Sequence, residues 1–524
     1  MLTDFPFYLL LIAVIVMLIM LAEKIKVAYP VLLVLAGLGI SFIPGIPPLH
    51  IESELIFIIF LPPLLYEAAW AISWKELWKW RRIISSFAFI VVFFTALSVA
   101  FVANYFIPGF SLALGFLLGG IVSPPDAVSA GAILKFVKVP RRFSSILEGE
   151  SLLNDASSLI IFRFAFIAVA TGQFIWHEAA LSFGWMIFGG IGIGLVSAYL
   201  IMLVHKHLPT DANTDLVLTL LTPYAMYIAA EEVHSSGVLA VVSGGLYLSN
   251  KRLVFLSSSS RLRGVNVWES LCFILNGLVF MLIGLDLPEI TEGLQETGLS
   301  QAIQYGLLIT GVLILARVIS AFSAVVTTLI ARNFITVADS RNPGVRGPLV
   351  LGWCGMRGVV SLAAALSIPT HLDDGTPFPQ RNLILFITFV VILTTLLLQG
   401  LTLPWMIKKL SITDPDYVMP EEEMYNKVRK HLSDYAVEQL HSRYGAELQA
   451  QPGLRQVLQK LEASGSQSGD NVLFGHETKE VYRSILNLQR EWLTEKNRRH
   501  NIDEEIIRRH LLFLDLEEEK LALL

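Results

Sequence analysis

The chain has 524 residues, of which 54% are hydrophobic and 16% charged, and its mean hydropathy is +0.62. Soluble domains carry about 25% charged residues, so this composition excludes an ordinary soluble enzyme. The two cysteines, Cys272 and Cys354, both lie in apolar runs and cannot build a disulfide framework or a four-ligand zinc site. A net charge of −5 and a pI near 6.1 give no electrostatic case for a nucleic-acid partner.

Long apolar runs dominate the first four-fifths of the chain. A membrane-spanning helix needs about 20 mainly apolar residues. The first run is expected to remain as a spanning helix rather than be cleaved as a signal peptide, because Asp4 precedes it and the basic stretch Glu23–Lys26 follows it. The sequence predicts an all-α polytopic membrane protein with thirteen spans, near residues 5–22, 27–43, 54–72, 83–106, 111–135, 144–170, 179–204, 214–231, 236–250, 267–287, 299–330, 348–369 and 383–407.

Basic residues are distributed unevenly between the loops. The seven loops after odd-numbered spans hold 20 Lys and Arg in total, whereas the other six hold one, Arg381. Because Lys and Arg accumulate in cytoplasmic loops, this asymmetry predicts an N-terminus outside and a C-terminus in the cytoplasm.

Several ionisable residues fall within or beside the predicted spans. Each would be costly if it faced lipid, so these residues are expected to face partners or a water-filled cavity and to mark an ion path. Buried structural ion pairs, or side chains that snorkel to span ends, are the alternative. The residues are Glu67, Asp126, Glu150, Asp155, Arg163, Glu269, Arg317 and Arg357.

Two spans are interrupted by helix-breaking residues. The fifth contains Ser-Pro-Pro-Asp at Ser123–Asp126, and the twelfth contains a glycine-rich stretch at Gly352–Gly358. These spans are seven apart and therefore run in opposite directions, as inverted repeats require, and paired broken spans indicate a transporter's midplane site. We expect them to cross, with Asp126 and Arg357 offsetting the partial charges of the half-helix ends. The alternative is that the glycines only permit close helix packing.

The sixth span begins with a polar motif. At about 100° per residue, Ser151, Asp155 and Ser158 share one helix face, and Glu150 and Asn154 share a neighbouring one. A carboxylate among hydroxyl and amide oxygens suits a small monovalent cation, and the same carboxylate can take a proton instead. A helix-capping role would explain Ser151 but not a carboxylate one turn deeper.

Four motifs together resemble the sodium/proton exchanger (monovalent cation:proton antiporter) family, in its bacterial electroneutral branch. They are FLPPLLYEAAW at Phe60–Trp70, SPPDAVSAG at Ser123–Gly131, EGESLLNDASSL at Glu148–Leu159 and GMRGVVSLAAAL at Gly355–Leu366. They occur in order on the predicted spans. The resemblance covers the thirteen spans and not the tail.

The resemblance implies roles for particular residues. Asp155 is similar to the family's aspartate that binds Na+ or the proton, with Asn154 as its neutral neighbour. Asp126 resembles the second acidic residue of the cavity, Ser151 a hydroxyl ligand, and Glu67 an acidic residue near the site.

A structural ion pair is also implied. Glu150 resembles a glutamate that pairs with an arginine, here Arg317, which leaves Arg357 as the separate arginine of the second broken helix. The reverse assignment of the two arginines stays open.

The resemblance implies a homodimeric antiporter, not an enzyme, that exchanges Na+ or Li+ for H+ across the plasma membrane in pH homeostasis, without a cofactor. Family members with Asn-Asp are similar to electroneutral exchangers, so one-for-one exchange by alternating access is expected, with Asp155 carried by a moving core. The alternatives are a K+/H+ antiporter, an ion channel on the same scaffold and a non-transporting membrane sensor. Partners are the two ions and membrane lipid.

The chain divides by charge into two parts. Residues 1–409 hold 24 basic and 23 acidic residues and form the predicted transmembrane exchanger domain, whereas residues 410–524 hold 15 and 21. The tail has the acidic starts and apolar repeats of amphipathic helices and a flexible linker at Ala463–Asp470. We expect a cytoplasmic helical domain with a regulatory or dimer-stabilising role, or a packed cap without a signalling role.

Overall fold

The computed structural model describes residues 5–43, 53–135, 137, 139–172, 176–294, 298–334, 344–372 and 375–410, together with a few isolated positions beyond. The chain separates into two compact units, Met1–Asp414 and Pro415–Leu524. The helices predicted for the tail fall almost wholly outside the described residues, and the description below concerns the first unit.

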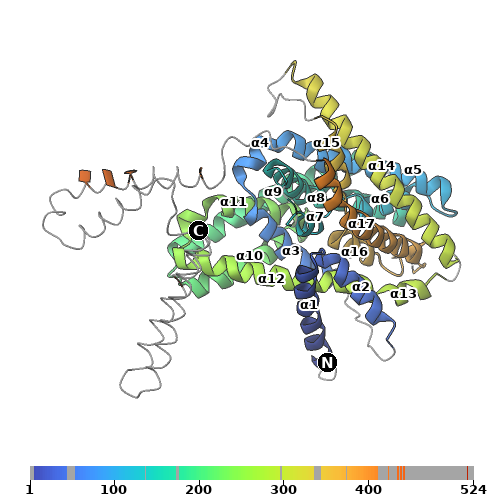
Figure 1. The fold of residues 1–524 in the computed structure, drawn as a ribbon, viewed down its shortest axis with the longest axis horizontal. Coiled ribbons are helices and arrows are strands. Elements are labelled where there is room, and N and C mark those ends of the chain that lie inside the picture. Colours follow the sequence, from blue (N-terminus) through green and yellow to red (C-terminus); the bar gives the residue numbers. More distant parts are fainter. Residues whose placement is uncertain are drawn as a thin grey trace. The chain divides into compact units, whose positions relative to one another are not determined.

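The first unit is built from helices (Figure 1). Within the described ranges, the β pairing amounts to one isolated bridge between His371 and Pro377. The first half contains α1 (Phe5–Ile25), α2 (Tyr29–Ser41), α3 (Ser53–Ala71), α4 (Trp74–Ser85), the π-helix η1 (Ser86–Val91), α5 (Val92–Phe106), α6 (Leu112–Val122), α7 (Ala127–Leu134) and α8 (Arg141–Thr171). The second half contains α9 (Trp176–His207), α10 (Ala212–Glu231), α11 (Gly237–Phe255), α12 (Ser258–Leu285), α13 (Leu287–Glu292), α14 (Leu299–Ala331), α15 (Arg346–Trp353), α16 (Val359–Leu366) and α17 (Arg381–Leu410).

Every apolar run singled out in the sequence contains helix. In the described part of the chain, eight helical stretches are long and apolar enough to cross a membrane, and α2 and Ile58–Ala71 are shorter apolar helices. The all-helical membrane architecture is therefore confirmed. The exact number of spans and the inverted repeats stay predictions.

Both predicted interruptions are breaks between two helices. Helix α6 ends at Val122 and α7 begins at Ala127, and α15 ends at Trp353 and α16 begins at Val359. Pro124 and Pro125 lack amide hydrogens and disfavour helical geometry in the residues before them, which explains the first break.

Short polar side chains begin many of the helices. Each accepts a hydrogen bond from a backbone amide of the first turn, which satisfies a donor that the helix cannot pair internally. These capping residues are Ser73, Ser111, Asp126, Asp211, Ser236 and Ser257.

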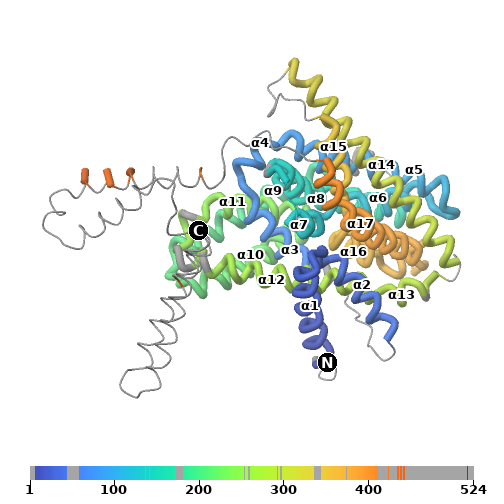
Figure 2. The backbone as a smooth tube through the Cα atoms, in the orientation of Figure 1, coloured from blue at the N-terminus to red at the C-terminus, as the bar shows by residue number. Residues whose placement is uncertain are grey.

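Two groups of helices position the site, and glycines allow close approach in each. The site bundle (α6, α7, α8, α15 and α16) lies centrally, and the flanking bundle (α3, α9, α10 and α11) lies to one side of it (Figures 1 and 2). A Cβ at Gly120 would meet the backbone of Phe162, so α6 and α8 are in direct backbone contact. A Cβ at Gly194 would meet the Ala240 carbonyl oxygen, which brings α9 equally close to α11. Leu159 of α8 packs against the apolar clusters of both bundles.

Candidate functional site

The first broken helix presents a carboxylate at its gap. Asp126 is the N-cap of α7, and its side chain accepts hydrogen bonds from Val128 N at 2.9 Å, Ser129 N at 3.3 Å and Ser129 Oγ at 2.5 Å. A carboxylate at this position is stabilised by the unpaired amides and the positive end of the helix dipole. Asp126 thus lies where its negative charge offsets the positive partial charge at the start of α7.

The second broken helix places an arginine at the C-terminus of α6, where the helix dipole has its negative end. Arg357 is 1% exposed, and its Nε donates to the Val122 carbonyl oxygen, at the end of α6, over 2.5 Å. Its Nη1 donates to the Gly355 carbonyl, and its backbone amide donates to Thr395 Oγ1 at 3.2 Å. A cation at a helix C-terminus is the favourable counterpart of a carboxylate at an N-terminus.

The two breaks touch each other. Asp126 N donates to the Met356 carbonyl oxygen at 2.7 Å, a bond between residues 230 positions apart in the sequence. A Cβ on Gly358 would overlap the Asp126 carboxylate, so the residue that follows Arg357 has no room for a side chain. The broken segments therefore meet, as expected for crossing discontinuous helices.

Helix α8 brings the Asn-Asp pair against this crossing. Asn154 is fully buried, and its Nδ2 donates to the Pro125 carbonyl oxygen at 3.2 Å, while its Oδ1 has no partner among the described residues. Ser151 Oγ accepts from Ala127 N at 3.2 Å. Both side chains thus satisfy backbone groups that the broken helix leaves free, and Ser151 caps α7 rather than its own helix.

Asp155 differs from its neighbours in how its carboxylate is used. It is 8% exposed, and Ser158 Oγ bonds to its backbone carbonyl at 3.0 Å rather than to its side chain. Among the described residues, no hydrogen bond ends on the Asp155 carboxylate oxygens. A buried carboxylate without donors requires a cation or a proton, because an isolated charge is costly in a medium of low dielectric.

Glu150 and Arg317 form a buried bidentate ion pair. Arg317 Nη1 lies 2.5 Å from Glu150 Oε1, and Nη2 lies 2.8 Å from Oε2. The two residues are 1% and 2% exposed, and the guanidinium also lies over the Phe87 ring at 5.7 Å. Of the two arginines weighed in the sequence, Arg317 is therefore the one that contacts Glu150, and Arg357 serves the broken helices.

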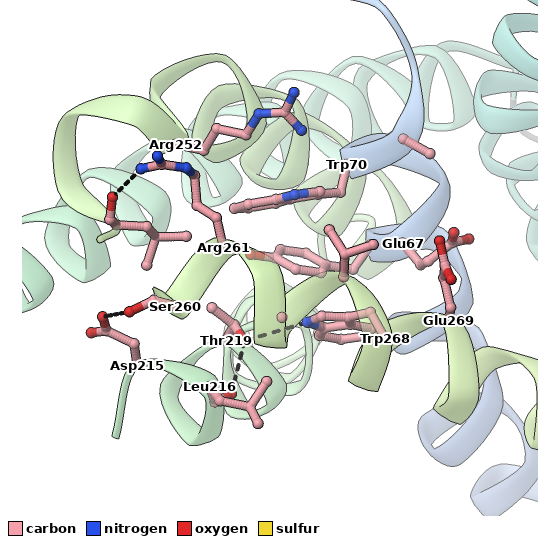
Figure 3. Close-up of a pocket in the computed structure, with 15 residues that line it drawn as sticks. Glu67, Trp70, Asp215, Leu216, Thr219, Arg252, Ser260, Arg261, Trp268 and Glu269 are labelled. Atoms are coloured by element: carbon pink, nitrogen blue, oxygen red, sulfur yellow. Dashed lines mark hydrogen bonds between the residues drawn. The ribbon is translucent and has the colours of Figure 1, made fainter. Parts of the chain in front are cut away.

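Glu67 lies in a separate cavity. A pocket of about 620 Å³ is lined by α3, α10, α11 and α12, and Figure 3 shows Glu67 beside Glu269 at one end of it, away from Asp215 and Ser260. In the described structure Glu67 makes no hydrogen bond to the residues around Asp126 and Asn154. Glu67 and Glu269 therefore line this pocket together.

Sequence reasoning missed several partners. Thr395 holds the Arg357 backbone, and Glu231 holds Arg163 at 2.7 Å. A threonine in an apolar helix and a glutamate at a helix end are too common to stand out in a sequence.

Within the described ranges, no cluster of three His, Cys, Asp or Glu side chains suited to a resident metal is present.

Comparisons with known proteins place this architecture among ion exchangers. A family model described as "Sodium/hydrogen exchanger, transmembrane" matches residues 10–409. The sodium, potassium, lithium and rubidium/H+ antiporter of Bacillus subtilis is 38% identical over 390 residues, which cover 72% of this chain and 57% of that protein. An uncharacterized Na+/H+ exchanger of Mycobacterium tuberculosis is 31% identical over 528 residues, which cover 98% of this chain and 95% of that one.

The fold has a solved counterpart. The sodium proton antiporter MjNhaP1 from Methanocaldococcus jannaschii matches with a TM-score of 0.63 and 20% sequence identity, over 78% of this chain and 99% of that chain. At this identity the likeness shows the fold alone. The matched region spans little more than half the length of the Bacillus relative, so its full activity does not transfer directly.

Proposed function

The chain belongs to the sodium/hydrogen exchanger family, and we propose on that basis that it is a secondary active antiporter that exchanges Na+ or Li+ for H+ across the plasma membrane. The observation that carries the proposal is the buried Asp155 carboxylate, which accepts no hydrogen bond within the described part of the chain and is set against two broken helices that meet. The transported cation binds at Asp155, and a proton replaces it there. No catalytic step or resident cofactor enters this mechanism.

The balance of buried charge supports exchange at one carboxylate. Glu150 and Arg317 neutralise each other, and Asp126 and Arg357 stabilise opposite half-helix ends. Asp155 is left without a countercharge among these groups, so its negative charge must be compensated before α8 can cross a region of low dielectric. Either a cation or a proton compensates it, and this mutual exclusion couples the two fluxes.

The neutral Asn154 favours one cation per proton. Its amide bonds to the Pro125 carbonyl and adds no titrating group to the site. We expect exchange without net charge movement, as measured by the absence of a transport current in proteoliposomes under an imposed membrane potential. A current that reverses with that potential would contradict the one-for-one stoichiometry.

Topology and assembly complete the proposal. The distribution of Lys and Arg supports thirteen spans with the N-terminus outside and the C-terminus in the cytoplasm. The opposite directions of the two broken spans support inverted repeats and alternating access by a moving core. Ser151 and Glu67 complete the ion path in this proposal, residues 410–524 form a helical regulatory or dimer-stabilising tail, and the protein acts as a homodimer in membrane lipid.

K+/H+ exchange is the second candidate. The printed name of the Bacillus subtilis relative includes potassium and rubidium beside sodium and lithium. Oxygen ligands accept any of these ions, and the ion radius that the cavity accommodates decides between them.

The test uses purified protein in liposomes that contain a pH-sensitive dye. A proton gradient is imposed, and Na+, Li+ and K+ are added in turn to wild type, Asp155→Asn and the matched control Asp211→Asn. Asp211 caps α10 outside the site, and asparagine retains that capping role. We expect cation-dependent dissipation of the gradient in wild type and in the control, and its loss in Asp155→Asn. Equal activity of the two variants would refute the assignment of Asp155, and the order of the cations identifies the substrate.

A further inference from the structure

An ion pair joins the ion-carrying helix to the flanking bundle. Arg163 Nη2 of α8 lies 2.7 Å from Glu231 Oε2, at the last residue of α10. The other oxygen, Oε1, accepts from Gly237 N at 3.1 Å, at the first residue of α11. One carboxylate thus holds the arginine and caps the next helix at the same time.

The turn that carries Glu231 is itself held in place. Trp185 Nε1 of α9 donates to the Val233 carbonyl at 3.0 Å, and Ser236 N donates to the Met186 carbonyl at 3.2 Å. These bonds tie the α10–α11 turn to α9, within the flanking bundle. Arg163 therefore contacts a turn that is bonded to the rest of the flanking bundle. Relative movement of the two bundles must separate Arg163 from Glu231.

The middle of α8 is bonded to the rest of the site bundle and to α14 instead. Glu150, Ser151 and Asn154 bond to Arg317, to the backbone of α7 and to the break between α6 and α7. Asp155 and Arg163 are eight positions apart, about 12 Å along the helix. Leu159 lies between them and packs against both bundles. The seam between the bundles is thus apolar at Leu159 and closed by an ion pair one turn further on.

The pocket and the ion pair lie at opposite ends of α10. Asp215, near the start of α10, lines the pocket with Glu67 and Glu269, whereas Glu231 ends the helix. Sixteen positions separate Asp215 from Glu231, which corresponds to about 24 Å, most of a bilayer's hydrocarbon thickness. One end of the bundle therefore holds a cavity, and the other holds a polar contact across the seam.

We propose that Arg163 and Glu231 form a gate that closes the ion path at the end opposite the pocket and opens when the site bundle moves. The proposal rests on the proposed exchange function and assigns two residues that position the bundles without binding the ion. The side chains are 43% and 33% exposed, so the pair is accessible enough to separate in each cycle. Exposed ion pairs of this kind shift a two-state equilibrium by up to about fivefold.

The test measures access to the seam rather than transport. Leu159→Cys supplies a reporter thiol, and the native Cys272 and Cys354 are buried. A membrane-impermeant maleimide is applied from the outer face in right-side-out vesicles and from the pocket face in inside-out vesicles. Arg163→Gln, Glu231→Gln and their double variant are compared with Arg163→Lys, which retains the charge, and with Glu232→Gln, an exposed neighbour.

We expect the two neutralised variants to raise the outer labelling rate by about two- to fivefold and not to raise labelling from the pocket face. The double variant should be labelled no faster from the outer face than either single variant, because each single substitution already removes the same contact. Arg163→Lys and Glu232→Gln should label like the parent. Unchanged outer labelling, or an equal rise from both faces as in a loosened protein, would overturn the gate. Labelling does not depend on ion exchange, so failure of the exchange assay in wild type is a separate result that concerns the proposed function.

Discussion

Helix α8 carries one partner of each of two Arg–Glu pairs that differ in burial. The two pairs therefore allow the effect of burial on stability to be measured for the same kind of ion pair. Glu150–Arg317 is 1% and 2% exposed, whereas the side chains of Arg163 and Glu231 are 43% and 33% exposed. Glu150→Gln removes one charge and leaves Arg317 buried with its positive charge uncompensated. Breaking a buried pair in this way costs about 3–5 kcal/mol of unfolding free energy, whereas loss of an exposed pair costs about 0.2–1 kcal/mol. Arg163→Gln is therefore the matched control.

The assay is reversible unfolding of the purified protein in mixed micelles with increasing denaturing detergent, followed by intrinsic fluorescence. We expect Glu150→Gln and Arg317→Gln each to be destabilised by at least about 3 kcal/mol. A double replacement of the pair by Leu and Met should recover most of that loss, because the uncompensated charge is gone and apolar volume fills the space. A loss below about 1 kcal/mol for Glu150→Gln, or a loss equal to that of Arg163→Gln, would refute the reasoning.

Two further predictions concern the contacts of the broken helices. Gly358→Ala places a methyl group against the Asp126 carboxylate, so we expect exchange in the liposome assay to fall more than tenfold. The control Gly311→Ala, whose Cβ would meet open space, should retain exchange. Equal activity of the two variants would contradict the close approach of Gly358 to Asp126. Ser151→Ala removes the acceptor for Ala127 N, and we expect a loss of about 1 kcal/mol in the same unfolding assay; an unchanged midpoint would show that Ser151 does not cap α7.

Local patterns were sufficient to predict the helices and their interruptions. Apolar runs of membrane length correspond to helices, and the Pro124–Pro125 pair marks the end of α6 because proline removes backbone donors whatever its surroundings. The role of Asp126 at the start of α7 follows from the same local chemistry, because it caps the residues that directly follow it. Such features depend on neighbours along the chain and so can be predicted from it.

Contacts between distant helices were not predictable in the same way. Ser151 shares a face with Asp155, which makes it a candidate ion ligand, but this periodicity does not indicate that its hydroxyl also accepts from Ala127 N, 24 positions earlier in the sequence. Arg163 was an intramembrane charge without an evident partner, and Glu231 lies 68 positions away. Helical periodicity indicates which residues share a face, but the neighbour of that face depends on how the helices pack.

The distribution of polar bonds along α8 favours one kind of motion over another. Three side chains around Asp155 bond to the broken helices or to α14, and separation of α8 from them would expose a buried ion pair and free carbonyls at the cost of several kcal/mol. The seam toward the flanking bundle is apolar at Leu159, and its ion pair at Arg163 is half exposed and inexpensive to break. Helix α8 and the broken helices are therefore expected to move together, with Asp155 carried at a fixed geometry past the flanking bundle. Since the ligand geometry then stays constant, the same oxygens bind the cation or the proton from either side, as alternating access requires.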